Sequence, residues 1–235
     1  MITVDKYELV ERYEALGEES DFLEAKRLFE ADLPGQQDAI FFRQYGYLLE
    51  CHGRRVIRRA LQQYERSIAL DPGAEKVRYQ WLSAKTALFE SDDAIAVQKK
   101  RVADSPGNPG ELRLLATAYL LARDFDSATE VIAAGLKLAP DDPGLLGNRG
   151  EVKAAKGDPV GALADWRRAH ELDREDLSSV YSGAFLLERE GRLAEAAEAW
   201  RYIVDWNVAR GYELTAVWPR EELDRVRGLL ADGTS

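Results

Sequence analysis

The segment GDPVGALADWRRAHELD, residues 157–173, decides the fold because its pattern recurs along the chain. Its alanine belongs to a series in which each alanine follows the previous one by 34 residues. The series consists of Ala60, Ala94, Ala128, Ala162 and Ala196. The residues four places after these alanines are Tyr64, Gln98, Ile132, Trp166 and Trp200. A fixed period of this length is typical of proteins built from stacked helical repeats.

Composition and charge exclude several classes of protein. The 235 residues are 46% hydrophobic and 31% charged, a composition able to bury a core in water. The net charge of −10 argues against nucleic acid as a partner, because binding phosphates needs a basic surface. A single cysteine, Cys51, excludes an internal disulfide framework and a cysteine-rich zinc site. With no signal peptide or apolar span in the sequence, we expect a cytoplasmic protein that does not enter a membrane.

The period divides the chain into helix pairs. The divisions are 1–38 (a degenerate first repeat), 39–74, 75–108, 109–142, 143–176, 177–210 and a capping helix with tail at 211–235. In four repeats we expect the first helix to end near the fifteenth position, at Phe89, Arg123, Gly157 and Gly191. In 39–74, which is two residues longer, we expect it to end at Gly53, since glycine is a common helix terminator.

These features make the chain resemble the tetratricopeptide repeat (TPR) family, in which each 34-residue unit is a pair of antiparallel helices. That family has small residues at positions 8 and 20 of each unit and bulky residues at positions 7 and 11. Here position 8 is Gly46, Leu82, Ala116, Gly150 and Ala184, and position 20 is the alanine series. The departures include Arg149 and Gly183 at position 7, and Lys85 and Lys153 at position 11. The resemblance implies an all-α, right-handed superhelix (an α-α solenoid) of about six helix-turn-helix repeats with a C-terminal capping helix.

The resemblance also implies a peptide-binding groove lined by the first helix of each repeat. Carried over position by position, the groove residues are Arg43, Gln44, Tyr47, Tyr79, Gln80, Ser83, Arg113, Thr117, Asn148, Glu151, Tyr181, Ser182 and Phe185. Their spacing of three or four residues places them on one face of each helix. Aromatic rings supply contact area there, while amide and guanidinium groups reach backbone or carboxylate groups. We therefore expect a non-catalytic adaptor or assembly scaffold that binds a protein or peptide, without cofactor or metal.

Some TPR domains hold the C-terminal carboxylate of a peptide with a set of lysine and asparagine residues. At the corresponding positions this chain retains a single cation, Arg43, so such a clamp is not expected. Arg43 and Arg113 remain candidate anchors for acidic groups.

Arg149 and Lys153 occupy positions at which the family buries apolar side chains. One interpretation is that their stems pack while their charges reach solvent or pair with Glu151, Asp165 or Glu188. The alternative is a charged pocket inside the array that binds an anionic ligand.

Three further features have a structural and a functional interpretation. The basic run RRVIRR, residues 54–59, is either a solvated helix entry or a contact for an acidic partner or nucleic acid. Cys51 and His52 diverge as neighbours on a helix, and no catalytic or metal-binding motif surrounds them. Acidic pairs at 92–93 and 141–142 fit helix capping better than calcium binding.

The tryptophans near the C-terminus leave two alternatives open. Trp200, Trp206 and Trp218 either seal the last repeat against the capping helix or form a patch for self-association. The alternative functions are accordingly a structural protein that forms a homo-oligomer through its terminal repeats and, less favoured, a small-ligand pocket or enzyme built on the array.

Overall fold

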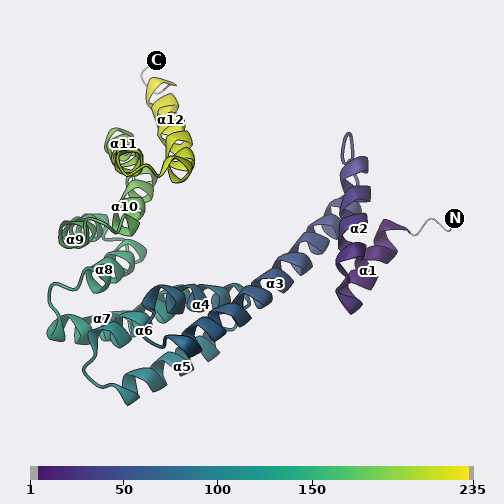
Figure 1. The fold of residues 1–235 in the computed structure, drawn as a ribbon. Helices are drawn as coiled ribbons and strands as arrows, with labels where there is room; N and C mark the ends of the chain where they lie inside the picture. Colours follow the sequence, from purple (N-terminus) through teal and green to yellow (C-terminus); the bar gives the residue numbers. More distant parts are fainter. Residues whose placement is uncertain (1–4, 233–235) are drawn as a thin grey trace. The chain divides into compact units, whose positions relative to one another are not determined.

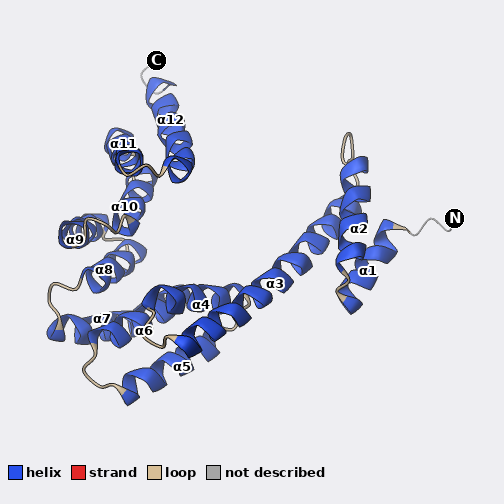
Figure 2. Ribbon diagram, viewed as in Figure 1, coloured by secondary structure: helices blue, strands red, loops and turns tan. Residues whose placement is uncertain are grey.

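The computed structural model describes residues 5–232, which form two compact units divided after Glu90. Residues 1–4 and the last three residues of the expected tail, 233–235, lie outside the described residues. The described part consists of helices joined by short loops and turns, and no strand occurs in it (Figure 2). The first unit contains α1 (Lys6–Leu16), α2 (Glu19–Asp32), α3 (Ala39–Leu70) and α4 (Glu75–Ala87). The second contains α5 (Ser91–Asp104), α6 (Pro109–Leu121), α7 (Phe125–Leu138), α8 (Pro143–Ala155), α9 (Pro159–Leu172), α10 (Ser178–Arg189), α11 (Leu193–Ala209), the 3-10 helix η1 (Glu213–Ala216) and α12 (Val217–Asp232).

The second unit is a stack of helix pairs in sequence order (Figure 1). α6 packs on α7, α8 on α9, and α10 on α11. Each pair also contacts the next. The second helix of one pair packs on the first helix of the following pair, α7 on α8 and α9 on α10, and the first helices contact each other, α6 with α8 and α8 with α10. Since each pair leaves an apolar face uncovered, the next pair buries it.

The alanine series marks the close crossings inside these pairs. Ala128, Ala162 and Ala196 have no exposed surface, and the large residue one turn later is buried beside each of them. In the α8–α9 pair the indole of Trp166 lies against Gly150, where an added Cβ would come within 2.4 Å of its Nε1. Two helices approach this closely only where the crossing residues are small.

The predicted ends of the first helices in four repeats are confirmed. Phe89, Arg123, Gly157 and Gly191 all adopt left-handed backbone angles, with φ of 61°, 60°, 83° and 70°. Two of the four are not glycine, although this conformation favours glycine. After two of these residues an aspartate caps the start of the second helix: Asp124 accepts from Ser127 N, and Asp158 accepts from Gly161 N.

The expected helix end at Gly53 is wrong, because α3 runs without interruption from Ala39 to Leu70. The residues after Gly53 offer no capping side chain and no proline, so nothing starts a second helix. The segment 39–74 therefore contains one long helix in place of a helix pair.

α3 contributes to two separate cores within the first unit. Its first half packs on α1 and α2 around an aromatic cluster that includes Tyr13, Phe29 and Phe41. Its second half packs on α4 around Leu61 and Leu88.

The capping helix, α12, begins at Val217, two residues before Pro219. Leu223 and Val226 bury their side chains against the last repeat, as expected of a cap. Leu229, further along the helix, is 46% exposed. The buried residues of α12 are thus Pro219, Leu223 and Val226.

Candidate functional site

Three predicted groove residues come together at the contact between α6 and α8. The Asn148 side chain donates from Nδ2 to the backbone oxygen of Arg113 at 3.2 Å and to Thr117 Oγ1 at 3.1 Å. Thr117 in turn donates its hydroxyl to the backbone oxygen of Arg113 at 3.0 Å. The two first helices are thus joined through side chains on the face that the sequence predicted to line a groove.

The same face continues from α8 to α10. Ser182 donates its hydroxyl to Glu151 Oε1 at 2.6 Å. Tyr181 and Phe185 lie beside Ser182 on α10, at positions that share this side of the helix. We call Arg113, Thr117, Asn148, Glu151, Tyr181, Ser182 and Phe185 the first-helix surface.

Arg113 is less available to a partner than its position suggested. Its Nη1 lies 3.1 and 3.0 Å from the two carboxylate oxygens of Asp142, the residue that caps α8. Its side chain also crosses the backbone at Gly144, where an added Cβ would come within 2.2 Å of Arg113 Cδ. The arginine therefore fixes the start of α8 and is not a free anchor for a carboxylate.

An aromatic cluster closes the C-terminal end of the first-helix surface. Trp218 of α12 stacks on Tyr181, with ring centroids 5.8 Å apart and planes at 16°. Phe185 meets the buried Trp200 edge to face at 5.1 Å. Burial raises the pKa of Tyr181, an effect that its hydrogen bond with Asn207 opposes. The cluster supports the interpretation that tryptophans seal the last repeat.

The other six predicted residues belong to the first unit. Arg43, Gln44 and Tyr47 lie on α3, and the Tyr47 hydroxyl donates to Glu14 of α1, which raises the pKa of Tyr47. On α4, Tyr79 is 51% exposed. Gln80, beside it, is exposed, and Ser83 is half-buried. Tyr47 thus has a structural contact, while Tyr79 and Gln80 present their side chains to solvent.

Arg149 and Lys153 form ion pairs with Asp165, one of the three acids considered for them. Arg149 Nε and Nη2 lie 2.8 and 2.6 Å from its two oxygens, and Lys153 Nζ lies 2.7 Å from Oδ2. The Asp165 side chain is 7% exposed. Its burial tends to raise the carboxyl pKa, but the hydrogen bonds from Arg149 and Lys153 outweigh burial and lower the pKa. The two cations therefore hold α8 to α9.

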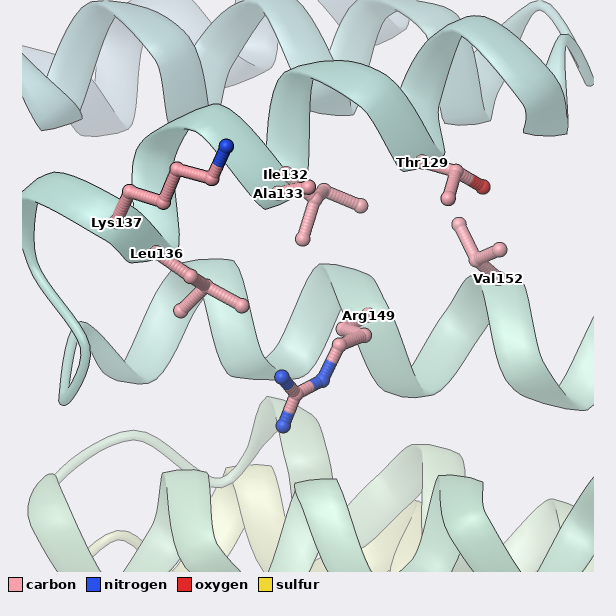
Figure 3. A pocket seen from close by; sticks show the side chains of 7 residues that line it. All are labelled: Thr129, Ile132, Ala133, Leu136, Lys137, Arg149 and Val152. Carbon is pink, nitrogen blue, oxygen red and sulfur yellow. The ribbon is translucent and has the colours of Figure 1, made fainter.

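A pocket of about 290 Å³ does lie beside Arg149, between α7 and α8. Its lining is mostly apolar and includes Ile132, Leu136 and Val152 (Figure 3). The Arg149 side chain extends away from the α7 residues, so its stem and not its guanidinium borders the space (Figure 3). Because the guanidinium is taken up by Asp165, the hypothesis of an anionic-ligand pocket gains no support.

The basic run 54–59 has intramolecular partners. Arg55 donates from Nη2 to the backbone oxygens of Tyr13 at 3.1 Å and Glu14 at 2.8 Å, at the C-terminal end of α1. Arg58 and Arg59 lie 3.6 and 3.9 Å from Glu90 and Glu19. Arg55 therefore joins α3 to the end of α1, while Arg58 and Arg59 form ion pairs at the surface of the first unit.

Cys51 and His52 are likewise structural. Cys51 is buried, and the His52 ring stacks on Phe22 with centroids 3.7 Å apart. His52 Nδ1 lies 3.0 Å from the Tyr13 hydroxyl. Within residues 5–232, no group of three or more His, Cys, Asp or Glu side chains is placed to hold a metal ion. In the same residues, no helix is long and apolar enough to cross a membrane.

Sequence reasoning missed a second pocket, of about 310 Å³, between α9, α10 and α11. Gly183 lines it. The signal was present in the sequence, since Gly183 stands where the resemblance predicts a bulky residue.

Comparison with known proteins supports the fold. No protein-family model and no curated protein matches the chain. TTC0263, a TPR protein of Thermus thermophilus, has a similar structure, with a TM-score of 0.54 and 19% identity, covering 89% of this chain and 99% of that chain. The APC/C hetero-tetramer Cut9-Hcn1 gives a TM-score of 0.50 and 16% identity, covering 96% of this chain and 49% of that chain.

Structural similarity at 16–19% sequence identity establishes the fold of this chain. The stacked helix pairs and buried alanine crossings place the chain among the all-α repeat proteins. Within that class its fold is the tetratricopeptide-repeat fold.

Proposed function

We propose that this protein is a non-catalytic adaptor or assembly scaffold that binds a protein or peptide along the first-helix surface. The repeats at 109–142, 143–176 and 177–210 would build this surface. The observation that carries the proposal is the continuity of the predicted residues across three consecutive first helices, α6, α8 and α10. The similarity to Cut9-Hcn1, a hetero-tetramer, is in keeping with a fold used for assembly.

The chemistry of the surface favours an extended segment with polar and basic groups. Glu151 is exposed and carries the negative charge, while Phe185, 47% exposed, supplies apolar contact area. Rigid aromatic anchors surrounded by polar groups are typical of protein interfaces. The net charge of −10, like Glu151, favours encounter with a basic partner.

Affinity purification with matched variants tests the proposal. A Glu151→Lys/Phe185→Ala variant changes two exposed residues of the surface, and Glu130→Lys makes the same charge reversal on the second helix α7. We expect binding proteins captured by the wild type to be lost with the double variant and retained with Glu130→Lys. Thermal melting of each variant verifies folding. An identical set of captured proteins for all three chains would contradict the proposal.

Self-association is the second candidate function. Trp218 and Phe185 lie together and are 45% and 47% exposed, which leaves an apolar patch beside the capping helix. Light scattering of the wild type and Trp218→Ala distinguishes the two functions. A wild-type oligomer that dissociates in the variant would favour self-association over the adaptor role.

A further inference from the structure

One position of the repeat loses its side chain in the last helix pair. At intervals of 34 residues the first helices carry Trp81, Leu115, Arg149 and Gly183. Leu115 is buried in the core around α6 and α7. At Gly183, an added Cβ would have Leu163 Cδ2 as its nearest neighbour, at the ordinary contact distance of 3.7 Å. The structure therefore has room for a larger residue that the sequence does not supply.

The space forms the pocket of about 310 Å³ between α9, α10 and α11, three helices that pack in succession (Figure 1). Its apolar wall comes from Leu163, Trp166, Val180, Leu187 and Ala199. The volume lies at the lower end of the range of ligand sites in proteins. It is suited to one large side chain of a partner.

This pocket is separate from the first-helix surface. Val180, Gly183 and Leu187 are spaced by three and four residues, so they share one face of α10. Successive residues of an α-helix are rotated by about 100°, so Tyr181 and Phe185 project from the opposite side of α10. A partner in the pocket and a partner on the first-helix surface would bind different sides of the stack.

Basic side chains border the pocket. Arg167 and Arg174 line it and are exposed, and the acid among its lining residues is Glu171. In the described part of the chain the Arg174 guanidinium forms no ion pair or side-chain hydrogen bond. His170 is fixed between them, with Nε2 2.8 Å from the Tyr202 hydroxyl and Nδ1 3.2 Å from the backbone oxygen of Asp176. The rim thus complements an anionic partner.

We propose that this pocket binds one bulky apolar side chain carried by an acidic peptide segment, whose carboxylates meet Arg174 and Arg167. The apolar side chain occupies the volume that Gly183 leaves open. The proposal concerns a second binding surface and does not depend on the function assigned to the first.

Selection from a displayed library of random heptapeptides tests the proposal, with fluorescence anisotropy of the enriched peptides on the full chain. The principal variant is Gly183→Leu, which places a side chain in the space; an added Cβ there has Leu163 at an ordinary contact distance, and thermal melting verifies that the variant folds. Arg174→Glu reverses the rim charge, and Glu151→Lys serves as a control on the first-helix surface.

We expect enriched peptides with an aromatic or branched aliphatic residue beside Asp or Glu. Gly183→Leu should weaken them about tenfold or more, because it blocks a buried anchor. Arg174→Glu should weaken them and reduce the gain in affinity at low salt, since Arg167 remains, while Glu151→Lys should leave them unchanged. No enrichment, peptides without acidic residues, or equal binding to Gly183→Leu would overturn the proposal. Saturable binding of free octanoate without any peptide would also overturn it, in favour of a small-molecule site.

Discussion

Two glycines of this chain occur in similar sequence surroundings and have different structural roles. Gly157 ends α8 with φ of 83°, and the next helix begins two residues later. Gly53 lies inside α3, which continues through it for a further 17 residues to Leu70. Both glycines follow an amphipathic stretch of helix, so the glycine alone does not decide where a helix ends.

The residues after each glycine account for the outcome. Asp158 accepts a hydrogen bond from Gly161 N at 2.8 Å, and Pro159 occupies the first helical turn, so a new helix is both capped and preset. Arg54 and Arg55 follow Gly53 and favour continued helix. In this comparison a signal that starts the next helix accompanies the break at Gly157 and is missing at Gly53.

The largest effect is expected from placing a capping aspartate and a proline after Gly53 in α3. The double variant Arg54→Asp/Arg55→Pro creates the sequence Gly-Asp-Pro found at 157–159. Proline inside a helix costs roughly 3 kcal/mol or more, and the variant also removes the hydrogen bonds from Arg55 to α1. Hydrogen exchange should show unprotected amides near residues 53–57, together with a lower free energy of unfolding. Arg54→Asp alone is the control, and protected amides in the double variant would contradict the explanation.

The next largest effect is expected at the alanine series, where Ala162 of the α8–α9 pair is compared with Ala60 of α3. Ala162→Leu overpacks a fully buried crossing between α8 and α9 and should lower the free energy of unfolding by roughly 1–3 kcal/mol. Ala60, its counterpart in α3, is only half-buried, because α3 continues where a helix pair would cross. Ala60→Leu should therefore cost less than Ala162→Leu in chemical denaturation. Equal costs would show that the crossing at Ala162 is not the tighter one.

The ion pairs of Asp165 predict a dependence on pH confined to the α8–α9 pair. Hydrogen bonds lower the folded-state pKa of Asp165 below its unfolded value of about 3.9. The resulting stability is complete well above that value and is lost as the pH falls through the folded pKa. Asp165→Asn should lower the free energy of unfolding by roughly 1–2 kcal/mol at pH 7, because it removes the ion pairs with Arg149 and Lys153. The effect is no larger because both cations are partly exposed to solvent. The difference in melting temperature between the two chains should narrow as the pH falls below about 3.9; a constant gap would argue against this role.

The smallest effects have opposite signs. Gly53→Ala should raise the free energy of unfolding by about 0.5–1 kcal/mol, because a Cβ there meets open space inside a helix. Gly157→Ala should lower it by about 1 kcal/mol, because alanine is strained at positive φ. Denaturation of the two single variants under one condition measures both. The same sign for the two variants would mean that the glycines have equivalent roles.

The sequence predicted the second unit more successfully than the first for the same physical reason. At Arg123 and Gly157 a left-handed terminus is followed directly by an aspartate cap, so local chemistry fixes these two turns. Gly53 satisfied only half of that condition. The partner of Arg149 was named among three acids, but choosing Asp165 required the packing of α8 against α9.

Parts of the candidate site depended on tertiary contacts that spacing does not reveal. The stacking of Trp218 on Tyr181 joins residues 37 positions apart through the placement of α12. The salt bridge between Arg113 and Asp142 likewise depends on how α8 approaches α6. The pocket at Gly183 arises from an absent side chain, and its volume follows only from the positions of the surrounding helices.

The continuity of α3 has a consequence for how the first 90 residues unfold. Linear arrays of separate repeats lose structure one unit at a time from their ends. A single helix about 48 Å long that belongs to two cores transmits the loss of one to the other, since helix formation is itself cooperative. We therefore expect the α1–α2 core and the α4 core to melt in one transition, with no intermediate that retains either alone.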